Sequence, residues 1–322
     1  MLMTKQNIET IRATGTKLVI VAVCTYKRPK MLDICLHSLV SQTVPIDVIL
    51  QIAVVDNDQF GSGHQSYTRF AHCYPFWSVY LQEHKRGIAS CRNKAIQYAR
   101  EQEADFLAFI DDDEVAHEDW LMEHMERSGQ DILSGQHVMH YPESIPNWAY
   151  SEKPKRIGKE GEDYGPGTGN MVLSSRVFNS LSFDETLGLG GGEDMDFLRR
   201  ARLFGFRRYY VPNAIVYESA HPQRYTFFGT IKRCHWEYAA DMRYGIARRG
   251  KFKAILKKTP SMVFALPISL MMAIGGLALY PAHNTYGLRM ILKAGKIMAR
   301  ALGRLTAIYG HIPQSYTVTV GE

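Results

Sequence analysis

The sequence predicts an α/β protein with a doubly wound, mostly parallel sheet. Three observations lead to this prediction: apolar segments rich in β-branched residues recur along the first part of the chain, segments with helical spacing separate them, and the apolar segments end in polar residues. Strands that alternate with helices form parallel sheets, and ligands bind at the carboxyl ends of such strands. The polar strand ends therefore mark the expected position of a site.

The first strands and helices follow one another in regular order. The expected strands are 17–24, 48–55, 77–82 and 106–110, and the expected helices are 29–41, 87–101 and one that begins near Glu118. Pro29 suits the first turn of a helix, and apolar residues follow it at helical spacing. Gly61 and Gly63 mark a loop after the second strand.

The strand Phe106–Ile110 is the most informative of these. It is an unbroken apolar run, as expected for a strand buried on both faces, and it leads directly into Asp111, Asp112, Asp113 and Glu114. Like charges this close repel one another unless a cation neutralises them, and hard oxygen ligands favour Mg²⁺ or Mn²⁺. Acids also suit the first turn of a helix, so the acidic run alone leaves a metal site and a solvated helix start both open.

Composition and missing motifs narrow the function. The 322 residues carry a net charge of +6, and the five cysteines form no C-x-x-C pair, which fits a reducing cytoplasm. The segment 1–15 has neither the apolar core nor the cleavage pattern of a secretion signal. No G-x-G-x-x-G follows the first strand and no G-x-x-x-x-G-K-[ST] occurs, which disfavours a dinucleotide fold and excludes an ordinary P-loop.

Five motifs, in this order, resemble those of the family 2 glycosyltransferases, enzymes with the GT-A fold. The motifs are Val21–Pro29, Val54–Asn57, Gly87–Asn93, Asp111–Asp113 and Gly191–Asp194. Each is weak alone, but their order and spacing between residues 17 and 245 are specific. The type that the chain resembles builds bacterial exopolysaccharides such as succinoglycan.

The resemblance implies a nucleotide-sugar donor, with UDP as the expected nucleotide. Contacts with the donor are implied for Thr25, Arg28, Asp56, Arg92, Asp111 and Asp112. Among these, Asp56 would accept a hydrogen bond from the base, and Arg92 would face the diphosphate from the start of a helix. Their local patterns also allow a turn residue at Asp56 and a surface arginine at Arg92.

The resemblance further implies an inverting, metal-dependent transfer. The implied ligands of Mn²⁺ or Mg²⁺ are Asp113, Asp111 and His221, with Glu218 as an alternative to His221. Asp194 would be the general base that removes the proton of the acceptor hydroxyl. The implied acceptor side comprises Gly192, Glu193 and Trp236. Local pattern alone equally allows the acids near Asp194 to cap a helix.

The C-terminal part of the chain has a different character, so we expect a GT-A domain over 1–245 and a helical extension over 246–322. An apolar, charge-free stretch, Ser261–Leu279, lies between two basic segments. Its length is close to the roughly 20 residues that span a bilayer, but positive charge on both flanks disfavours a single crossing. Arg289, Arg304 and three basic residues between them share one face of a following helix, as in helices that lie on anionic membranes.

We therefore expect a re-entrant or surface-embedded hairpin on the inner, cytoplasmic face of the cell membrane. One true crossing and a helical subdomain buried against the catalytic domain are the alternatives. The predicted function is sugar transfer to a saccharide acceptor, in lipid-linked form, during synthesis of a surface polysaccharide.

Two other functions are weighed against this prediction. A sugar nucleotidyltransferase would need a glycine-rich, lysine-bearing loop, and Thr25–Lys30 contains no glycine. A non-catalytic nucleotide-binding scaffold is the other alternative. Nucleic-acid binding is disfavoured, because the cations accompany an apolar segment rather than an aromatic-lined groove.

Overall fold

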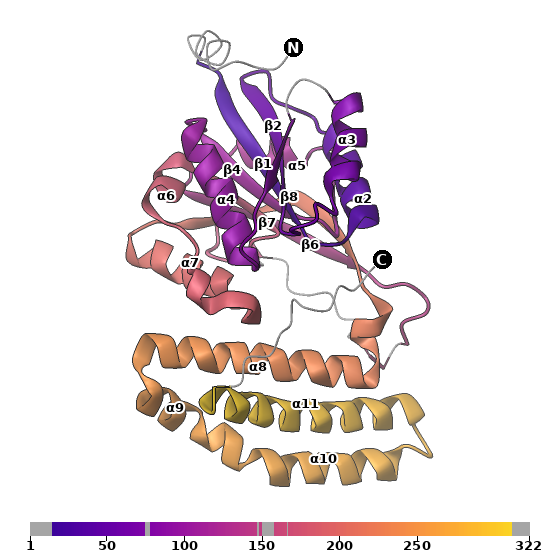
Figure 1. The fold of residues 1–322 in the computed structure, drawn as a ribbon. Coiled ribbons are helices and arrows are strands. Elements are labelled where there is room, and N and C mark those ends of the chain that lie inside the picture. Colours follow the sequence, from indigo (N-terminus) through magenta and orange to yellow (C-terminus); the bar gives the residue numbers. More distant parts are fainter. Residues whose placement is uncertain (1–14, 75–77, 147, 150–157, 166, 311–322) are drawn as a thin grey trace.

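The structure is a computed structural model that describes residues 15–74, 78–146, 148–149, 158–165 and 167–310. Within these residues an eight-stranded sheet forms the centre, with the strand order β3-β2-β1-β4-β7-β6-β8-β5. A layer of long helices lies beyond one edge of this α/β part (Figure 1). The predicted α/β class is confirmed.

The first four strands form the parallel half of the sheet. They are β1 (Lys17–Thr25), β2 (Val48–Asp56), β3 (Ser78–Gln82) and β4 (Phe106–Asp111), joined through α2 (Pro29–Val40), α3 (His64–Cys73) and α4 (Ile88–Glu101). In the parallel register Thr25 lies opposite Asp56, and Cys24 lies opposite Asp111. The polar strand ends therefore meet at one edge, as expected. Residue 77, the expected start of the third strand, lies outside the described residues.

Helices cover both faces of this half because alternate residues of a strand point to opposite faces. Val19, Val21 and Val23 of β1 share one buried cluster with α2. Leu18, Ile20 and Ala22 share the other cluster with α4. The sheet is therefore doubly wound, with β1 and β4 buried on both sides.

The second half turns mostly antiparallel. Its elements are β5 (Glu114–Ala116), α5 (Trp120–Met125), β6 (Ile132–His140), β7 (Asn170–Ser174), α6 (Ser175–Ser180), the 3₁₀ turn η1 (Glu185–Gly190), α7 (Glu193–Leu203), β8 (Arg208–Ser219) and a second 3₁₀ turn, η2 (Pro222–Tyr225). Strand β7 runs antiparallel to both β4 and β6, whereas β8 is parallel to β6 and antiparallel to β5. This pairing places the ends of β5 and β8 beside the end of β4.

Asn170 joins three strands in the buried centre of this half. Its Oδ1 accepts from Trp120 Nε1 at 2.8 Å and lies 2.9 Å from His124 Nε2, while its Nδ2 donates to the carbonyl of Ala214 at 2.8 Å. Burial lowers the pKa of His124 to about 4, so the imidazole is neutral at pH 7.

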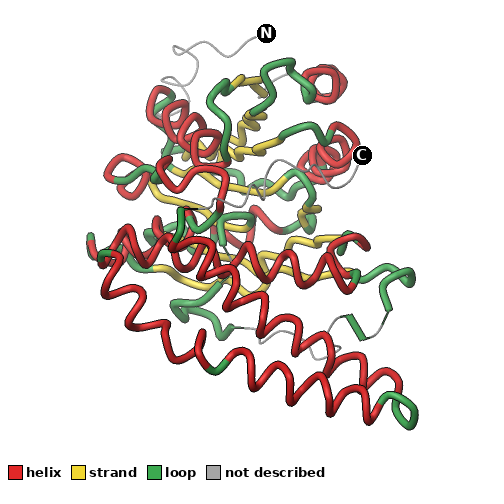
Figure 2. Tube along the Cα trace, turned by 60° about the horizontal axis from the view of Figure 1, so that its bottom comes forward, coloured by secondary structure: helices red, strands yellow, loops and turns green. Residues whose placement is uncertain are grey.

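The helical layer consists of α8 (Phe227–Arg249), α9 (Lys251–Val263), α10 (Ala265–Leu279) and α11 (Asn284–Ile308). Helix α11 lies between α8 and α10 in Figure 1, and Figure 2 shows the long helices from a second direction. Glycines allow these close contacts: a Cβ on Gly303 would lie 2.2 Å from the carbonyl oxygen of His235 in α8, and one on Gly287 would lie 2.7 Å from that of Gly276 in α10. Helices of this spacing pack backbone against backbone.

The apolar stretch is mostly uncovered. In the part of the chain that the structure describes, the segment Lys251–Leu279 is the one helical segment long and apolar enough to cross a bilayer, and 17% of its most apolar window is buried. A core helix of a soluble domain would be mostly buried.

The structure describes the faces of the basic helix, α11. Arg289, Lys293 and Arg300 are exposed on it, whereas Arg304 is buried, with its guanidinium 4.7 Å from the ring centre of Tyr238 in α8. Large apolar residues are also exposed on α9 and α10. The contact of α11 with a membrane stays a prediction. The expected domain boundary at 245/246 falls inside α8, and the division into two domains stays a prediction.

Candidate active site

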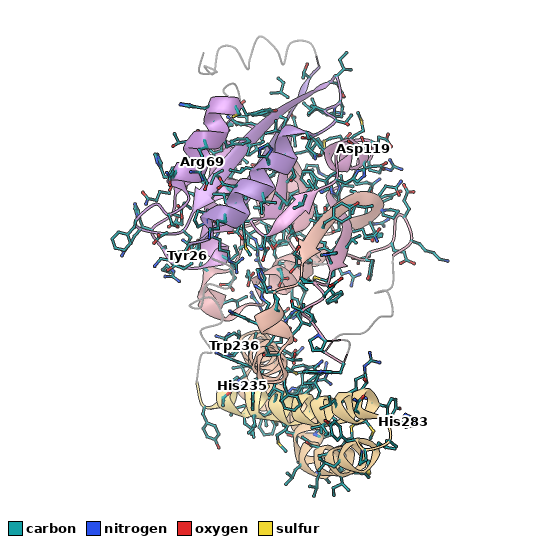
Figure 3. The ribbon with its side chains drawn as sticks, turned by 90° about the vertical axis from the view of Figure 1, so that its right-hand side faces the viewer. Tyr26, Arg69, Asp119, His235, Trp236 and His283 are labelled. Carbon is teal, nitrogen blue, oxygen red and sulfur yellow. The ribbon has the colours of Figure 1, made fainter. Side chains whose placement is uncertain are left out.

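A cleft of about 1270 Å³ runs from the ends of β1 and β4 to the helical layer. Asp113 and Asp194, the predicted metal ligand and the predicted base, both line it. So do Tyr26 on the strand side and Trp236 on α8, and Figure 3 shows these two residues on the two sides of the boundary between the layers. The structure therefore brings the two key carboxylates into one cavity.

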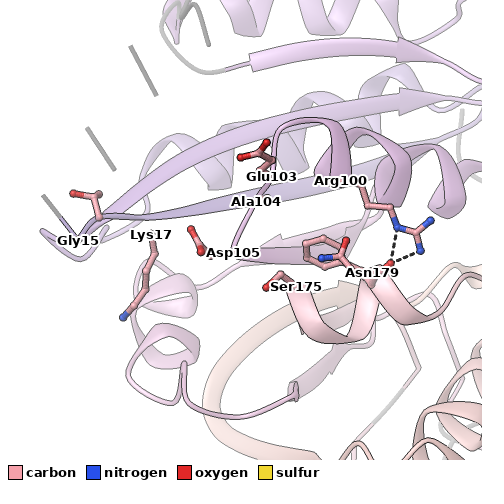
Figure 4. A pocket seen from close by; sticks show the side chains of 10 residues that line it. Gly15, Lys17, Arg100, Glu103, Ala104, Asp105, Ser175 and Asn179 are labelled. Carbon is pink, nitrogen blue, oxygen red and sulfur yellow. Dashed lines mark hydrogen bonds between the residues drawn. The ribbon is translucent and has the colours of Figure 1, made fainter. Parts of the chain in front are cut away.

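A second pocket lies at the other end of β1. It measures about 540 Å³ and is lined by Lys17, Asp105 and Ser175, among others. Arg100, also at its wall, donates to the carbonyl of Phe178 (Figure 4). None of the predicted site residues lines this pocket, so the site is assigned to the larger cleft.

The loop after β1 holds the acidic end of β4. Thr25 Oγ1 donates to Asp112 Oδ2 at 2.8 Å. Arg28 Nη1 lies 3.1 Å from both Asp112 Oδ1 and Asp113 Oδ2. Burial raises the pKa of Asp112 to about 7, although Arg28 opposes this shift. One guanidinium thus neutralises part of a cluster in which unbalanced negative charge would be costly.

A buried ion pair connects α4 to α7. Arg92 Nη1 donates to Glu193 Oε1 at 2.9 Å, and Arg92 Nη2 lies 3.4 Å from Asp111 Oδ1. Both Arg92 and Glu193 are buried, and burial raises the pKa of Glu193 although Arg92 opposes the shift. Glu193 was expected on the acceptor side. Its carboxylate pairs with Arg92 in the cleft wall, which fixes the first turn of α7, and its role on the acceptor side stays a prediction.

Two glycines with positive φ precede the first turn of α7, in which Asp194 lies. Gly191 and Gly192 have φ of 75° and 97°, a region that favours glycine. Asp194 Oδ1 accepts from the backbone N–H of Met195 at 2.7 Å, and a Cβ on Gly167 would lie 2.4 Å from Asp194 Oδ2. The backbone at Gly167 therefore lies directly against this carboxylate.

Residues at the ends of β4, β5 and β8, together with His137 of β6, suit a divalent cation. Glu114, His137 and Glu218 offer ligand atoms that all lie within 4.8 Å of one another, and His221 Nε2 lies 3.9 Å from Asp113 Oδ2. Burial lowers the pKa of His221, which favours the neutral imidazole that metals bind. Mn²⁺ accepts carboxylate ligands together with imidazole, so these residues fit a bound Mn²⁺ ion.

Sequence reasoning missed His137. This residue lies in the middle of β6, outside any acidic motif, and only the parallel pairing of β6 with β8 brings it beside Glu218. Glu114 was recognised only as part of the acidic run. Its pairing with Glu218 across β5 and β8 places it in the same group.

Asp56 does not line the cleft. It is fully buried, and its oxygens accept from Gly63 N at 2.6 Å, from Asp58 N at 2.9 Å and from Tyr80 Oη at 2.8 Å. A carboxylate has about four acceptor positions, so roughly one is left for a base. Asp56 thus lies beside Thr25 at the strand ends, but its side chain is buried, and its contact with the base stays a prediction.

Two residues at the cleft wall were not predicted. The guanidinium of Arg86 lies 3.8 Å from the ring centre of Tyr26. Tyr26 lies within the motif Val21–Pro29, and Arg86 directly precedes the motif Gly87–Asn93. On the opposite wall the ammonium of Lys232 lies over the ring of Trp236, 4.8 Å from the ring centre. Aromatic and cationic groups thus occur on both sides of the cleft.

Comparisons with known proteins point to one family. The model of Glycosyl transferase family 2 matches residues 20–185. The succinoglycan biosynthesis protein ExoM of Rhizobium meliloti (strain 1021) is 28% identical over 294 residues, which cover 86% of this chain and 91% of that protein.

Solved structures share the fold at low identity. The mannosyltransferase PcManGT from Pyrobaculum calidifontis, solved with GDP-Man and Mn²⁺, gives a TM-score of 0.59 at 16% identity, over 89% of this chain and 86% of that one. S. aureus TarS gives a TM-score of 0.52 at 16% identity, over 90% of this chain and 55% of that one.

Proposed function

The chain belongs to glycosyl transferase family 2, and on this basis we propose that it transfers a sugar from a UDP-sugar to a saccharide acceptor with inversion at the anomeric carbon. The observation that carries the proposal is the shared cleft, which both Asp113 and Asp194 line. Asp113 could bind a cation and Asp194 could accept a proton in the same cavity. This combination suits a reaction in which a diphosphate departs while a hydroxyl attacks.

The donor would occupy the β1–β4 end of the cleft. Thr25 and Arg28 from the loop after β1, and Arg92 from α4, supply polar and cationic groups for the nucleotide and its diphosphate. A divalent ion would be held by Asp113 and His221, with Glu218 nearby, and it would supply charge stabilisation for the departing nucleoside diphosphate. The manganese in the PcManGT structure supports this assignment by fold alone.

Asp194 would act as the base. The acceptor hydroxyl oxygen bonds to the anomeric carbon while the bond from that carbon to the diphosphate oxygen breaks, and the hydroxyl proton passes to the Asp194 carboxylate. Its Oδ1 already accepts from Met195 N–H, so Oδ2 is the oxygen for the proton. A general base of this kind contributes about 10²- to 10⁴-fold in rate.

Two substitutions separate binding from chemistry. Asp194→Asn should keep donor affinity and lose transfer by about 10²-fold or more, whereas Asp113→Ala should lose the effect of Mn²⁺ on donor binding. Asp119→Asn is the control, because Asp119 is exposed and outside the cleft. Transfer at the full rate by folded Asp194→Asn protein would exclude Asp194 as the base.

We further propose that the acceptor is a lipid-linked saccharide and that the protein binds the inner face of the cell membrane from the cytoplasm, as a peripheral or re-entrant protein. The likeness to ExoM supports a place in exopolysaccharide synthesis. The outer face of α9 and α10 exposes Phe264, Leu266, Leu270 and Ile274. Lys251, Lys253 and Lys257 are exposed on α9 beside it, which is the combination that binds anionic bilayers.

Vesicle flotation tests the membrane assignment. Leu270 and Ile34 are 59% and 60% exposed, the first on α10 and the second on α2 of the catalytic part. We expect Leu270→Glu to weaken flotation with anionic vesicles and Ile34→Glu to leave it unchanged. Equal flotation of the two variants would exclude the α10 face as the membrane contact.

A further inference from the structure

Two arginines from different layers hold the first turn of α7. Arg92 of α4 pairs with Glu193 from the side of the sheet, at 2.9 Å. Arg248 of α8 pairs with Asp196 from the side of the helical layer. Asp194 lies between these two acids in the sequence, so its position depends on both contacts.

The contact with the helical layer is built on a buried carboxylate. Asp196 is fully buried, and its Oδ2 accepts from Arg200 Nε at 2.7 Å, while Oδ1 faces Arg248. The same guanidinium donates to Asp184 Oδ2 at 2.9 Å, just before η1. Arg248 thus joins α8 to both segments that flank the glycines before Asp194.

A second contact joins the same two helices one turn earlier in α8. Arg199 Nη1 donates to Tyr244 Oη at 3.0 Å. The apolar side of α7 is fixed separately, because Phe197 stacks on Phe183 with ring centres 4.4 Å apart. Loss of Arg248 would therefore leave α7 folded on the sheet but free to shift at its first turn.

We propose that Arg248 is a positioning residue for Asp194, so that the helical layer completes the active site in addition to any role at a membrane. The inference rests on the proposed function, because it assumes that Asp194 is the base. A misplacement of about 1 Å at a reacting group can cost roughly 10²-fold in rate. A loss of this size is expected in kcat and not in donor affinity, because the donor end of the cleft is held by β1, α4 and β4.

The test compares Arg248→Ala with the loss of another arginine that forms an ion pair at α7. Arg202→Ala is the control. Arg202 lies in the last turn of α7, pairs with Asp163, and has a side chain that is 74% exposed. In detergent with Mn²⁺ and a UDP-sugar, we expect Arg248→Ala to lower kcat by about 10²-fold with an unchanged dissociation constant for UDP. Arg202→Ala should change neither.

In Arg248 one nitrogen, Nη2, contacts both Asp184 and Asp196. Arg248→Lys keeps the positive charge on a shorter, more flexible side chain with a point-like ammonium. We expect it to recover part of the lost kcat, and it decides the question if the alanine variant does not fold. Arg248→Ala should also have no further effect on the residual rate of Asp194→Asn. If Arg248 had a purely structural role, Arg248→Ala would lower kcat by the same factor in the unchanged protein and in Asp194→Asn, together with UDP affinity and Tm. That result would overturn the proposal.

The outcomes also separate this inference from the proposed function. If Asp194→Asn is inactive and Arg248→Ala is fully active, the positioning role alone is wrong. If Asp194→Asn is fully active, the assignment of the base is wrong.

Discussion

Gly167→Ala is a direct probe of the Asp194 carboxylate. The new Cβ would lie 2.4 Å from Asp194 Oδ2 and 3.5 Å from Asp194 Cγ. A Cβ and an oxygen that are not bonded normally lie about 3.5 Å apart, so Asp194 Oδ2 must move by about 1 Å. Because the obstructing atom is the end of a side chain, the protein should fold normally. A displacement of about 1 Å at a catalytic group predicts a fall in kcat of about 10²-fold.

The assay measures kcat for transfer, UDP affinity by calorimetry and thermal unfolding. Gly129→Ala is the control, because no atom lies within 4 Å of a Cβ built there. We expect Gly167→Ala to keep UDP affinity and Tm close to those of the unchanged protein. A folded Gly167→Ala protein that binds UDP and retains its full kcat would refute the role of the Asp194 carboxylate.

Three further predictions concern stability and metal binding. The pKa of His124 falls from 6.5 to about 4 on burial, so the unfolded chain binds a proton that the folded chain does not, and stability should fall by up to about 3 kcal/mol as pH drops through this window. Urea unfolding should give a lower free energy of unfolding at pH 5 than at pH 7. His124→Gln should reduce this difference. Glu218→Gln should weaken Mn²⁺ binding by about 10-fold or more, measured by paramagnetic resonance, and an unchanged affinity would place the ion elsewhere. Gly276→Ala should lower Tm because its Cβ would lie 2.8 Å from a backbone oxygen, whereas Gly275→Ala meets only a methionine methyl group at 3.2 Å and should not.

The strands of the first half were predicted to within about a residue or two because burial on both faces leaves an uninterrupted apolar signal. Helix α3 was not predicted. Only Ser66 and Phe70 are buried along it, which is too few for a periodic pattern. The contact of Arg304 in α11 with Asp241 of α8, 3.9 Å away, was not predictable, because the two residues are far apart in the sequence.

The site was predictable where its residues follow strands in sequence order. The Asp111–Asp113 run lies at the cleft because it stands at the carboxyl end of β4. Asp194 lies in the first turn of α7, and only the resemblance of its motif to the family pointed to it. His137 was not predictable, because its place in the site depends on the pairing of β6 with β8. The burial of Asp56 and the pairing of Glu193 with Arg92 depend on side-chain packing that no short motif encodes.

The most direct test is a crystal structure of the protein grown with Mn²⁺ and UDP, with the ion located by its anomalous scattering. We expect the ion to be bonded to Asp113, the diphosphate to lie between it and Arg28 or Arg92, and the Asp194 carboxylate to face the open side of the same cavity. A manganese peak and a nucleotide bound outside this cleft, for example in the pocket beside Arg100, would contradict the proposed mechanism.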